Sequence, residues 1–476
     1  MLRVTNAQQI NLLLGNLQNI QKDLSQVQEM LSSGKKVNRP SDEPIAFEQI
    51  MKYRNVINNI EKRSLAVQEG SQRLNLSESS IGTAQNIIQR AKEIALQQRN
   101  ATSSSGERQA IAQEVHQLLL SFIDAANTKI NDRYLFAGFE TQTTPYALTA
   151  SSTISTDART PSISANDDNT GSTSSTVAIQ TAGSLTGDKY KITFSDSTTF
   201  DVTNITTGAT VLSSQTYTSG GNIDFDGLRV VLTDNPSGPL GGDEFQITAH
   251  NASDATISAS VSTASALQPN VYEIRFTSPT AFDVVNVTSN QVLSSGNAYT
   301  SGANIVFGGI TTVITDGTVS PQAGDVFRVR PNYSYEGDTG SIAIEYDDGK
   351  TVGTNIVGSQ VFSGPNVDLI GTLQDLEQAL LTDTPSSLST VISNFTTGLD
   401  QLTNARADLG SKVNRLDRLS QGLDLLSTTT QDLRSGVEDT DVAAASSQLA
   451  TLQTNLNASL LTLSRQFDIS LLNYLK

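Results

Sequence analysis

The two ends of the chain carry its most regular spacing of apolar residues. Near the N-terminus the apolar side chains recur in steps of three and four, at Ile10, Leu13, Leu17, Ile20, Leu24, Val27 and Leu31. Near the C-terminus a similar series runs through Leu449, Leu452, Leu456, Leu460, Leu463, Phe467 and Leu471. Such steps place the side chains on one helix face, as in the a and d positions of a coiled coil. We therefore predict a terminal coiled coil from residues 1–40 and 437–476.

Two further helices are predicted in residues 41–145. Gly34 ends the first helix as a left-handed cap, and Ser41-Asp42-Glu43-Pro44 begins the next. That helix continues for about 55 residues, or about 80 Å. Its apolar positions are Ile50, Tyr53, Ile57, Ile60, Val67, Leu74, Ile81 and Ile88. Ser104 and Glu107 predict the start of a third helix through a capping box.

Helical periodicity returns after Thr384-Pro385, a cap followed by a proline at the first helical position. An unbroken seven-residue spacing then connects Phe395, Leu402, Leu409, Leu416 and Leu423. Gly436 is predicted to end this helix. Residues 41–145 and 365–436 together predict a helical bundle domain, built from parts that lie far apart in the sequence.

The middle of the chain has a different character. Residues 146–182 are mostly small and polar, which favours a low-complexity linker or loop. Beyond them the chain repeats itself at an offset of 82: YKITF at 190–194 recurs as YEIRF at 272–276, and YTSG at 217–220 recurs at 299–302. Alternating apolar residues between turn signals predict an antiparallel β unit in each copy, at 183–262 and 263–332. A β segment at 333–364 then returns to the helices.

The predicted fold is therefore α+β. A long coiled coil and helical bundle are built from both chain ends, and a mainly antiparallel β region with two tandem repeats is inserted between them.

Composition excludes several classes of function. The chain has no cysteine or tryptophan, and its net charge of -17 argues against nucleic-acid binding. It contains no apolar run near the roughly 20 residues that a membrane span needs. Its first residues lack the apolar core and cleavage site of a secretory signal. Export, if it occurs, is therefore expected to remove nothing.

The terminal segments are also unusually poor in charge. Residues 1–34 and residues 440–476 each contain four charged side chains, whereas residues 44–99 contain thirteen. A coiled coil in water normally carries charges beside its apolar seam. Polar, uncharged faces avoid the cost of burying ions, so we expect copies of the chain to pack around the terminal helices. The plainer alternative is a hairpin stalk in which the two ends pair only with each other.

No group of residues has the spacing of a catalytic, cofactor or metal site. The two histidines, His116 and His250, are far apart in the sequence, and a packed or surface role is expected for each. The acidic pairs at 167–168 and 347–348 lack the remaining ligands of a calcium loop. We therefore predict that the protein is not an enzyme and binds no cofactor.

Several motifs resemble the flagellin superfamily of bacterial flagella, and more closely its hook–filament junction branch. They are LSSGKKVNRPSDEP at 31–44, DRYLFAGF at 132–139, YEGD at 335–338, GSQVF at 358–362 and SLLNYL at 470–475. Flagellins proper usually lack the Arg39-Pro40 pair and continue differently after it. The resemblance covers roughly residues 1–146 and 333–476. Between them this chain has additional β units, which shorter members lack.

The resemblance implies a structural axial protein located outside the cell at the junction of hook and filament. Terminal helices of such proteins line an inner tube, and the variable domains face outward. The implied partners are copies of the chain in a ring or tube, the adjoining hook-associated protein, flagellin and a cytosolic export chaperone. A filament-forming flagellin is the first alternative. A coiled-coil adhesin that binds glycans through its β units is the second.

Overall fold

The computed structural model describes residues 6–100, 105–159, 161–166, 169–181, 184–185, 188–248, 251–347, 349–364, 366–382 and 385–474. These residues form helices and antiparallel sheets, which confirms the predicted α+β class. The chain divides into two compact units. Unit 1 contains Met1–Ser71, Ile344–Val352 and Asn414–Lys476, and unit 2 contains Gln72–Ala343 and Gly353–Val413.

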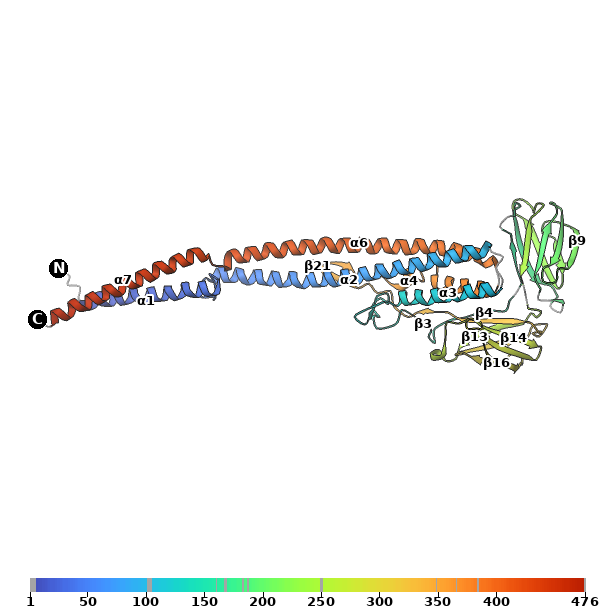
Figure 1. Ribbon diagram of the computed structural model, residues 1–476, viewed down its shortest axis with the longest axis horizontal. Coiled ribbons are helices and arrows are strands. Elements are labelled where there is room, and N and C mark those ends of the chain that lie inside the picture. Colours follow the sequence, from blue (N-terminus) through green and yellow to red (C-terminus); the bar gives the residue numbers. More distant parts are fainter. Residues whose placement is uncertain are drawn as a thin grey trace. The chain divides into compact units, whose positions relative to one another are not determined.

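The helices occupy both flanks of the sequence (Figure 1). They are α1 (Asn6–Ser33), α2 (Pro44–Asn100), α3 (Ser105–Ala126), α4 (Gly358–Val361), α5 (Leu369–Thr382), α6 (Pro385–Glu438) and α7 (Val442–Tyr474). Gly34 follows α1 with a φ of 72°, as predicted for a left-handed cap. Gly436 does not end α6, which continues to Glu438, because no change of φ sign interrupts the helix there. The predicted cap residues Ser104 and Thr384 lie outside the described residues.

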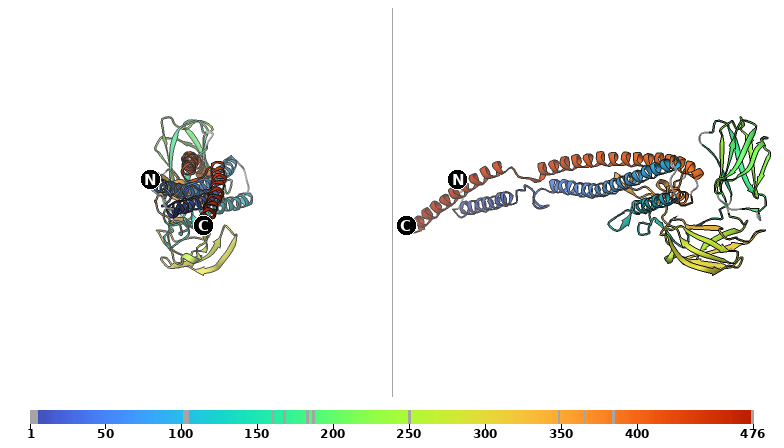
Figure 2. Two further views of the ribbon diagram at one scale, coloured as in Figure 1. Left: turned by 90° about the vertical axis from the view of Figure 1, so that its left-hand side faces the viewer. Right: turned by 45° about the vertical axis from the view of Figure 1, so that its right-hand side comes forward.

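Helices α2 and α6 run side by side in both views (Figures 1 and 2). Their predicted apolar positions are buried, except that Tyr53 is half-buried: Leu74, Ile81 and Ile88 on α2 are inaccessible to solvent. On α6 the same holds for Phe395, Leu402, Leu409 and Leu416, and Leu423 is 8% exposed. In unit 2, α3 and α5 pack against each other and add a further helical layer.

The first β domain is a sandwich of two antiparallel sheets. One sheet has the strand order β5-β12-β7-β8-β9 and the other β10-β11-β6. The strands are β5 (Ser162–Ala165), β6 (Thr173–Ile179), β7 (Tyr190–Phe194), β8 (Thr199–Asn204), β9 (Thr210–Thr216), β10 (Asn222–Phe225), β11 (Leu228–Asp234) and β12 (Glu244–Thr248). Alternate residues point inward, and Phe194, Val230 and Phe245 form part of the core.

The second β domain has the same strand order, β16-β15-β14-β19-β4 and β13-β18-β17. Its strands are β4 (Ile154–Asp157), β13 (Thr256–Val261), β14 (Tyr272–Ser278), β15 (Ala281–Asn286), β16 (Gln291–Ala298), β17 (Asn304–Phe307), β18 (Ile310–Thr315) and β19 (Val326–Pro331), with a short helix η2 (Ala264–Ala266). Strand β4 precedes the whole first β domain in the sequence. The first β domain is therefore inserted into the second, between β4 and β13.

The prediction of a linker at 146–182 was wrong. This segment contains β3 (Tyr146–Ala147), β4, β5 and β6, and it contributes to both β domains. In β6 every second side chain is half-buried, and Val177 packs on the core opposite Val230 of β11. The pairing partners lie about fifty residues or more away in the sequence, so local composition gave no sign of them.

The second β domain is attached to the helical layer of unit 2 by polar contacts. Arg330 donates from Nη2 to Asp375 Oδ1 at 2.9 Å, and Gln374 donates from Nε2 to the carbonyl oxygen of Pro331 at 3.0 Å. Thr288 donates to Glu377 Oε1 at 3.1 Å. Since Asp375, Gln374 and Glu377 all belong to α5, this helix is the support on which the domain rests.

Short strands connect the β domains to the helices. They are β1 (Lys129–Ile130), β2 (Arg133–Tyr134), β20 (Ser334–Tyr335), β21 (Ala343–Asp347) and β22 (Lys350–Gly353). Strand β20 pairs with β3, which places Tyr335 opposite Tyr146 and returns the chain to the helical layer. Within the described ranges, none of the helices combines the length and the apolar character needed to span a membrane.

Candidate functional site

The terminal helices α1 and α7 pack against each other within unit 1. They run in opposite directions, as the course of the chain in Figure 1 shows. The two apolar series at the chain ends are thus brought together by the fold. Pairing within one chain is the plainer of the two arrangements expected for the terminal helices. Whether this pairing is sufficient depends on how completely it covers the apolar side chains.

The pairing covers them only in part. Among the predicted interface residues, Val27 is buried at 3% exposure, and Leu460 is 46% exposed. Most of the others are half-buried, namely Leu13, Leu17, Ile20, Leu24, Leu31, Leu449, Leu452, Leu456 and Leu463. The side chains of Ile10, Phe467 and Leu471 lie outside the described residues. Among the described elements of unit 1, α1 and α7 have each other as their main packing partner, so the pair shields each seam mainly from one side.

Further apolar side chains lie outside the predicted seams. Leu12 on α1 is 64% exposed, and Leu461 on α7 is 57% exposed. Val442 at the start of α7 is 58% exposed. The spacing of the seams did not identify these residues, although leucine pairs such as Leu460-Leu461 were visible in the sequence. The terminal pair therefore presents apolar surface on more than one face.

A buried carboxylate, Glu438, lies where the chain turns from α6 into α7. The Glu438 side chain is 3% exposed, and its Oε1 forms ion pairs with Lys35 at 2.7 Å and with Arg54 at 2.5 Å. Arg434 Nε lies 3.4 Å from Oε2. We call these four residues the Glu438 clasp. It joins the α1–α2 connection, α2 and the end of α6.

Main-chain hydrogen bonds reinforce the Glu438 clasp. Lys36 donates its N–H to the carbonyl oxygen of Glu438 at 2.7 Å, and Thr440 donates to that of Gly34 at 3.0 Å. The α1–α2 and α6–α7 connections therefore form a short antiparallel bridge, where α1 ends and α7 begins. No pattern in the sequence identified Glu438, since its partners come from three separate elements and no spacing connects them.

The environment of Glu438 sets its protonation. Burial by itself raises the pKa of the Glu438 carboxyl, but the hydrogen bonds and charges of Lys35 and Arg54 outweigh burial and hold the pKa below its ordinary value. The carboxylate is thus ionised at neutral pH. It fixes the direction in which α7 leaves α6.

The candidates for chemistry occupy structural positions. His116 on α3 is buried, and its Nδ1 lies 3.1 Å from Glu377 Oε1. His250, Asp167, Asp168 and Asp348 lie outside the described residues. Within the described part of the chain, no three His, Asp or Glu residues gather in a way that could hold a metal ion.

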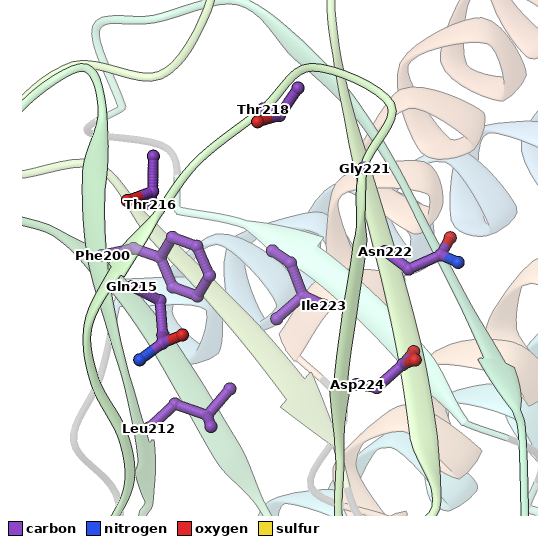
Figure 3. Close-up of a pocket in the computed structure, with 9 residues that line it drawn as sticks. All are labelled: Phe200, Leu212, Gln215, Thr216, Thr218, Gly221, Asn222, Ile223 and Asp224. Atoms are coloured by element: carbon purple, nitrogen blue, oxygen red, sulfur yellow. The ribbon is translucent and has the colours of Figure 1, made fainter.

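A pocket of 330 Å³ opens in the first β domain between the edge strands β9 and β10 (Figure 3). Phe200 and Ile223 lie toward each other at its floor, and both are buried in the domain core. Asn222 and Asp224 extend from β10 away from Phe200. The Asp224 carboxylate is already bound by Arg229 at 2.8 and 2.9 Å. The pocket is therefore mainly a gap between two sheet edges, lined by the polar residues Gln215, Thr216, Thr218, Asn222 and Asp224 above an apolar floor.

Comparisons with known proteins find matches to both helical flanks of the chain. Residues 4–141 match the bacterial flagellin N-terminal helical region, and residues 392–475 match the bacterial flagellin C-terminal helical region. The chain is 32% identical over 130 residues to flagellar hook-associated protein 3 of Escherichia coli (strain K12). That match covers 27% of this chain and 41% of the relative, so less than half of the relative's length is represented.

Two longer similarities extend over the β region. A flagellin of Salmonella rubislaw is 23% identical over 490 aligned positions, which cover 95% of each chain. The crystal structure of flagellar hook associated protein-3 from Legionella pneumophila has 19% identity, with 81% of this chain and 99% of that chain covered. Its TM-score of 0.34 is too low to support an assignment. The two ends of this chain are therefore similar to the N- and C-terminal helical regions of bacterial flagellins.

Proposed function

We propose that this chain is a structural axial protein that joins hook and filament in the bacterial flagellum. Its similarity to hook-associated protein 3 supports the location, and the motifs at 31–44 and 132–139 support the junction branch. The observation that carries the proposal is the incomplete burial of the α1 and α7 seams. The function is self-assembly rather than catalysis.

Assembly would complete the burial that a single chain leaves unfinished. Full burial of a leucine side chain contributes about 1.5–3 kcal/mol of stabilisation. A half-buried leucine can therefore contribute about half of this amount when a neighbouring subunit covers it. The predicted interface residues contribute this gain together in every subunit. Because the terminal helices carry few charges, their burial between subunits costs little desolvation energy.

The proposed partners are copies of the chain in a ring or tube, the adjoining hook-associated protein and flagellin. An export chaperone would cover the apolar terminal helices before assembly, and nucleic acid has no part in the function. The protein would act outside the cell after export without a cleaved signal. The terminal helices would form a coiled coil with their neighbours, and the β domains, which we regard as duplicated copies, would face outward.

A deletion strain tests the proposed location. Cells without the chain should build hooks of normal appearance, while flagellin leaks into the medium as unpolymerised subunits. Electron micrographs of the cells and immunoblots of the medium provide the two measurements. Attached filaments of normal length in the deletion strain would contradict the junction function.

Removal of residues 465–476 tests the terminal helices directly. We expect a folded and exported chain that fails to assemble, since the truncation shortens α7 by its last three turns. Brief protease digestion of the intact monomer should remove the ends first and leave a fragment near residues 42–435. Protease-resistant ends would instead show that the α1–α7 pair is complete in the monomer.

The main alternative is a filament-forming flagellin. It is favoured by the match to the Salmonella rubislaw flagellin along 95% of both chains. Immunogold labelling separates the two functions, because a junction protein labels one short zone beside the hook and a flagellin labels the whole filament.

A further inference from the structure

A polar groove of about 550 Å³ lies in unit 2, beside the second β domain. Strands β4 and β19 and the residues after β19 form one wall, and α5, the residues before it and Asn394 of α6 form the other. The volume is within the range of small-ligand sites, about 300–1,000 Å³. All the lining residues except Val367 and Gly371 have polar side chains. The groove therefore offers a ligand hydrogen bonds rather than apolar surface.

A buried arginine, Arg330, lies in the wall of the groove. Its side chain is 8% exposed, and it donates from Nη2 to Asp375 Oδ1 at 2.9 Å and from Nε to Asn332 Oδ1 at 3.3 Å. Its Nη1 is also buried and has no hydrogen-bond partner within the described residues. Buried donors in folded proteins are almost always paired, because an unpaired one costs free energy. The hydrogen-bond network around Arg330 therefore lacks an acceptor that a ligand could supply.

The rest of this network holds the groove in shape. Asn332 donates from Nδ2 to Thr153 Oγ1 at 3.0 Å and to Ser155 Oγ at 2.8 Å. Through Arg330 the same network continues to Asp375 on α5. The two walls are thus joined before any ligand arrives, so binding would cost little conformational entropy.

Other polar groups of the groove have no partner. The hydroxyl of Tyr333 and the side-chain amides of Asn366 and Asn394 form no hydrogen bond within the part of the chain that the structure describes. Asp375 is 56% exposed and binds Arg330 through Oδ1. Burial raises the pKa of Tyr333 to about 12, so its hydroxyl remains a donor at neutral pH. The groove therefore presents free donors and free acceptors together.

The charges of the groove disfavour several kinds of ligand. Asp375 balances Arg330, and Asp368, which accepts the N–H of Ile370 at 3.0 Å and caps α5, adds a second carboxylate. An anion would meet this excess of negative charge. A metal ion would find too few ligands, since no three His, Asp or Glu residues gather in the described part of the chain. A peptide would find little besides Val367 for its apolar side chains.

The first β domain shows that the arginine is not needed for the sandwich itself. Thr248 lies 82 residues before Arg330, at the end of β12. Arg330 has the corresponding place in β19, because β12 pairs with β7 in the same register in which β19 pairs with β14. The same kind of sheet forms with threonine at this position. The arginine therefore serves the groove and its connection to α5.

We infer that the groove binds a neutral saccharide. Each sugar hydroxyl both donates and accepts a hydrogen bond, which suits the free groups of Tyr333, Asn366, Asn394 and Asp375. An uncharged ligand also avoids the repulsion that an anion would meet. The site adds sugar recognition to the proposed assembly function and does not depend on it.

A binding experiment on the purified chain tests the inference. An array would carry neutral oligosaccharides of glucose, galactose, mannose and N-acetylglucosamine, with sialylated oligosaccharides as the anionic comparison. Titration calorimetry with the neutral oligosaccharide that binds best then gives the Kd. Tyr333→Phe and Asn394→Ala should each raise this Kd about two- to tenfold, because each removes a hydrogen bond. The matched control is Asn304→Ala on β17, an exposed amide of the same β domain outside the groove.

The expected result is binding of neutral oligosaccharides that both groove variants weaken and Asn304→Ala leaves unchanged. Circular dichroism melting curves would show that the variants fold like the natural chain. Absence of neutral-sugar binding, a preference for the sialylated oligosaccharides, or equal Kd values in the groove variants and the control would overturn the inference. These outcomes leave the junction function untouched, because the deletion strain tests it separately.

Discussion

Helices α6 and α7 carry the same kind of apolar spacing, but they bury it to different degrees. On α6 the leucines at 402, 409 and 416 are inaccessible to solvent. On α7 the leucines at 449, 452 and 456 are only half-buried. The first set lies on a helix that runs beside α2 and that α5 approaches where Leu369 lies next to Gly398, whereas the second set has α1 as its neighbour. The same pattern therefore produces a closed core on α6 and a partly exposed seam on α7.

The exposed apolar residues follow the same division. Most of the large apolar side chains that remain exposed lie in unit 1, although unit 1 is the smaller of the two units. Unit 2 contains the cores of both β domains and the α3–α5 layer. Unit 2 thus covers most of its apolar side chains within the chain, whereas unit 1 leaves more of them exposed.

The largest effect is expected when a leucine of α6 is replaced and the result is compared with the same replacement on α7. Leu409→Ala should lower the free energy of unfolding by about 2–5 kcal/mol, because it leaves a cavity in a closed core. Leu456→Ala should lower it by about 1 kcal/mol, since that side chain is half in water already. Urea unfolding followed by circular dichroism gives both values. Equal losses would show that the α1–α7 pair is a core like any other.

The next effect concerns the Glu438 clasp. Glu438→Gln leaves Lys35 and Arg54 without their counter-charge and should lower the free energy of unfolding by about 2 kcal/mol. The matched control is Glu43→Gln, because the Lys36–Glu43 pair is exposed on both sides and should cost less than about 0.5 kcal/mol. Urea unfolding compares the two variants. A similar loss in both would place the clasp among ordinary surface ion pairs.

Acid should remove the stabilisation that the Glu438 clasp provides. The pKa of Glu438 in the folded protein lies below its ordinary value of 4.5. The stabilisation is therefore fully present above pH 4.5 and is lost as the pH falls through the lowered folded pKa. Unfolding measured between pH 7 and pH 3 should show a steeper loss for the natural chain than for Glu438→Gln. Parallel curves would show that the loss of stability in acid does not come from Glu438.

The smallest effect on the monomer is expected at an exposed leucine of α7. Leu461→Gln should change the free energy of unfolding by less than about 0.5 kcal/mol, since the side chain is 57% exposed. Attachment of filaments should nevertheless fall, because in the proposed assembly neighbouring subunits would bury the same side chain. Asn457→Gln on the same helix is the control and should change neither quantity. Normal attachment in Leu461→Gln would remove this face from the proposed interface.

Much of the helical part was predictable because its signals are local. A spacing of three and four residues depends only on the helical repeat, so the positions from Ile50 to Ile88 and from Phe395 to Leu423 were identified with their buried face. Gly34 was identified for the same reason, since a left-handed cap needs a residue without a side chain. The repeated strands were visible through their matching anchors, YTSG among them.

The rest depended on partners that are distant in the sequence. Strands β4, β5 and β6 consist largely of serine and threonine, and only their pairing with β19, β12 and β11 makes them strands. Glu438 and Asp375 are single acidic residues whose importance comes from the groups that surround them. Periodicity contains no information about such contacts, because they join elements at unrelated positions.

The sequence alone showed which side chains share a helix face and where the helices and the repeated strands lie, but it did not show the strands of residues 146–182. Helical and strand periods are properties of the backbone, so every stretch with the right spacing reveals its own face. Only the tertiary structure decided how far each face is covered. Coverage depends on how many neighbouring elements pack around a helix, and that number differs between α6 and α7 despite their similar patterns.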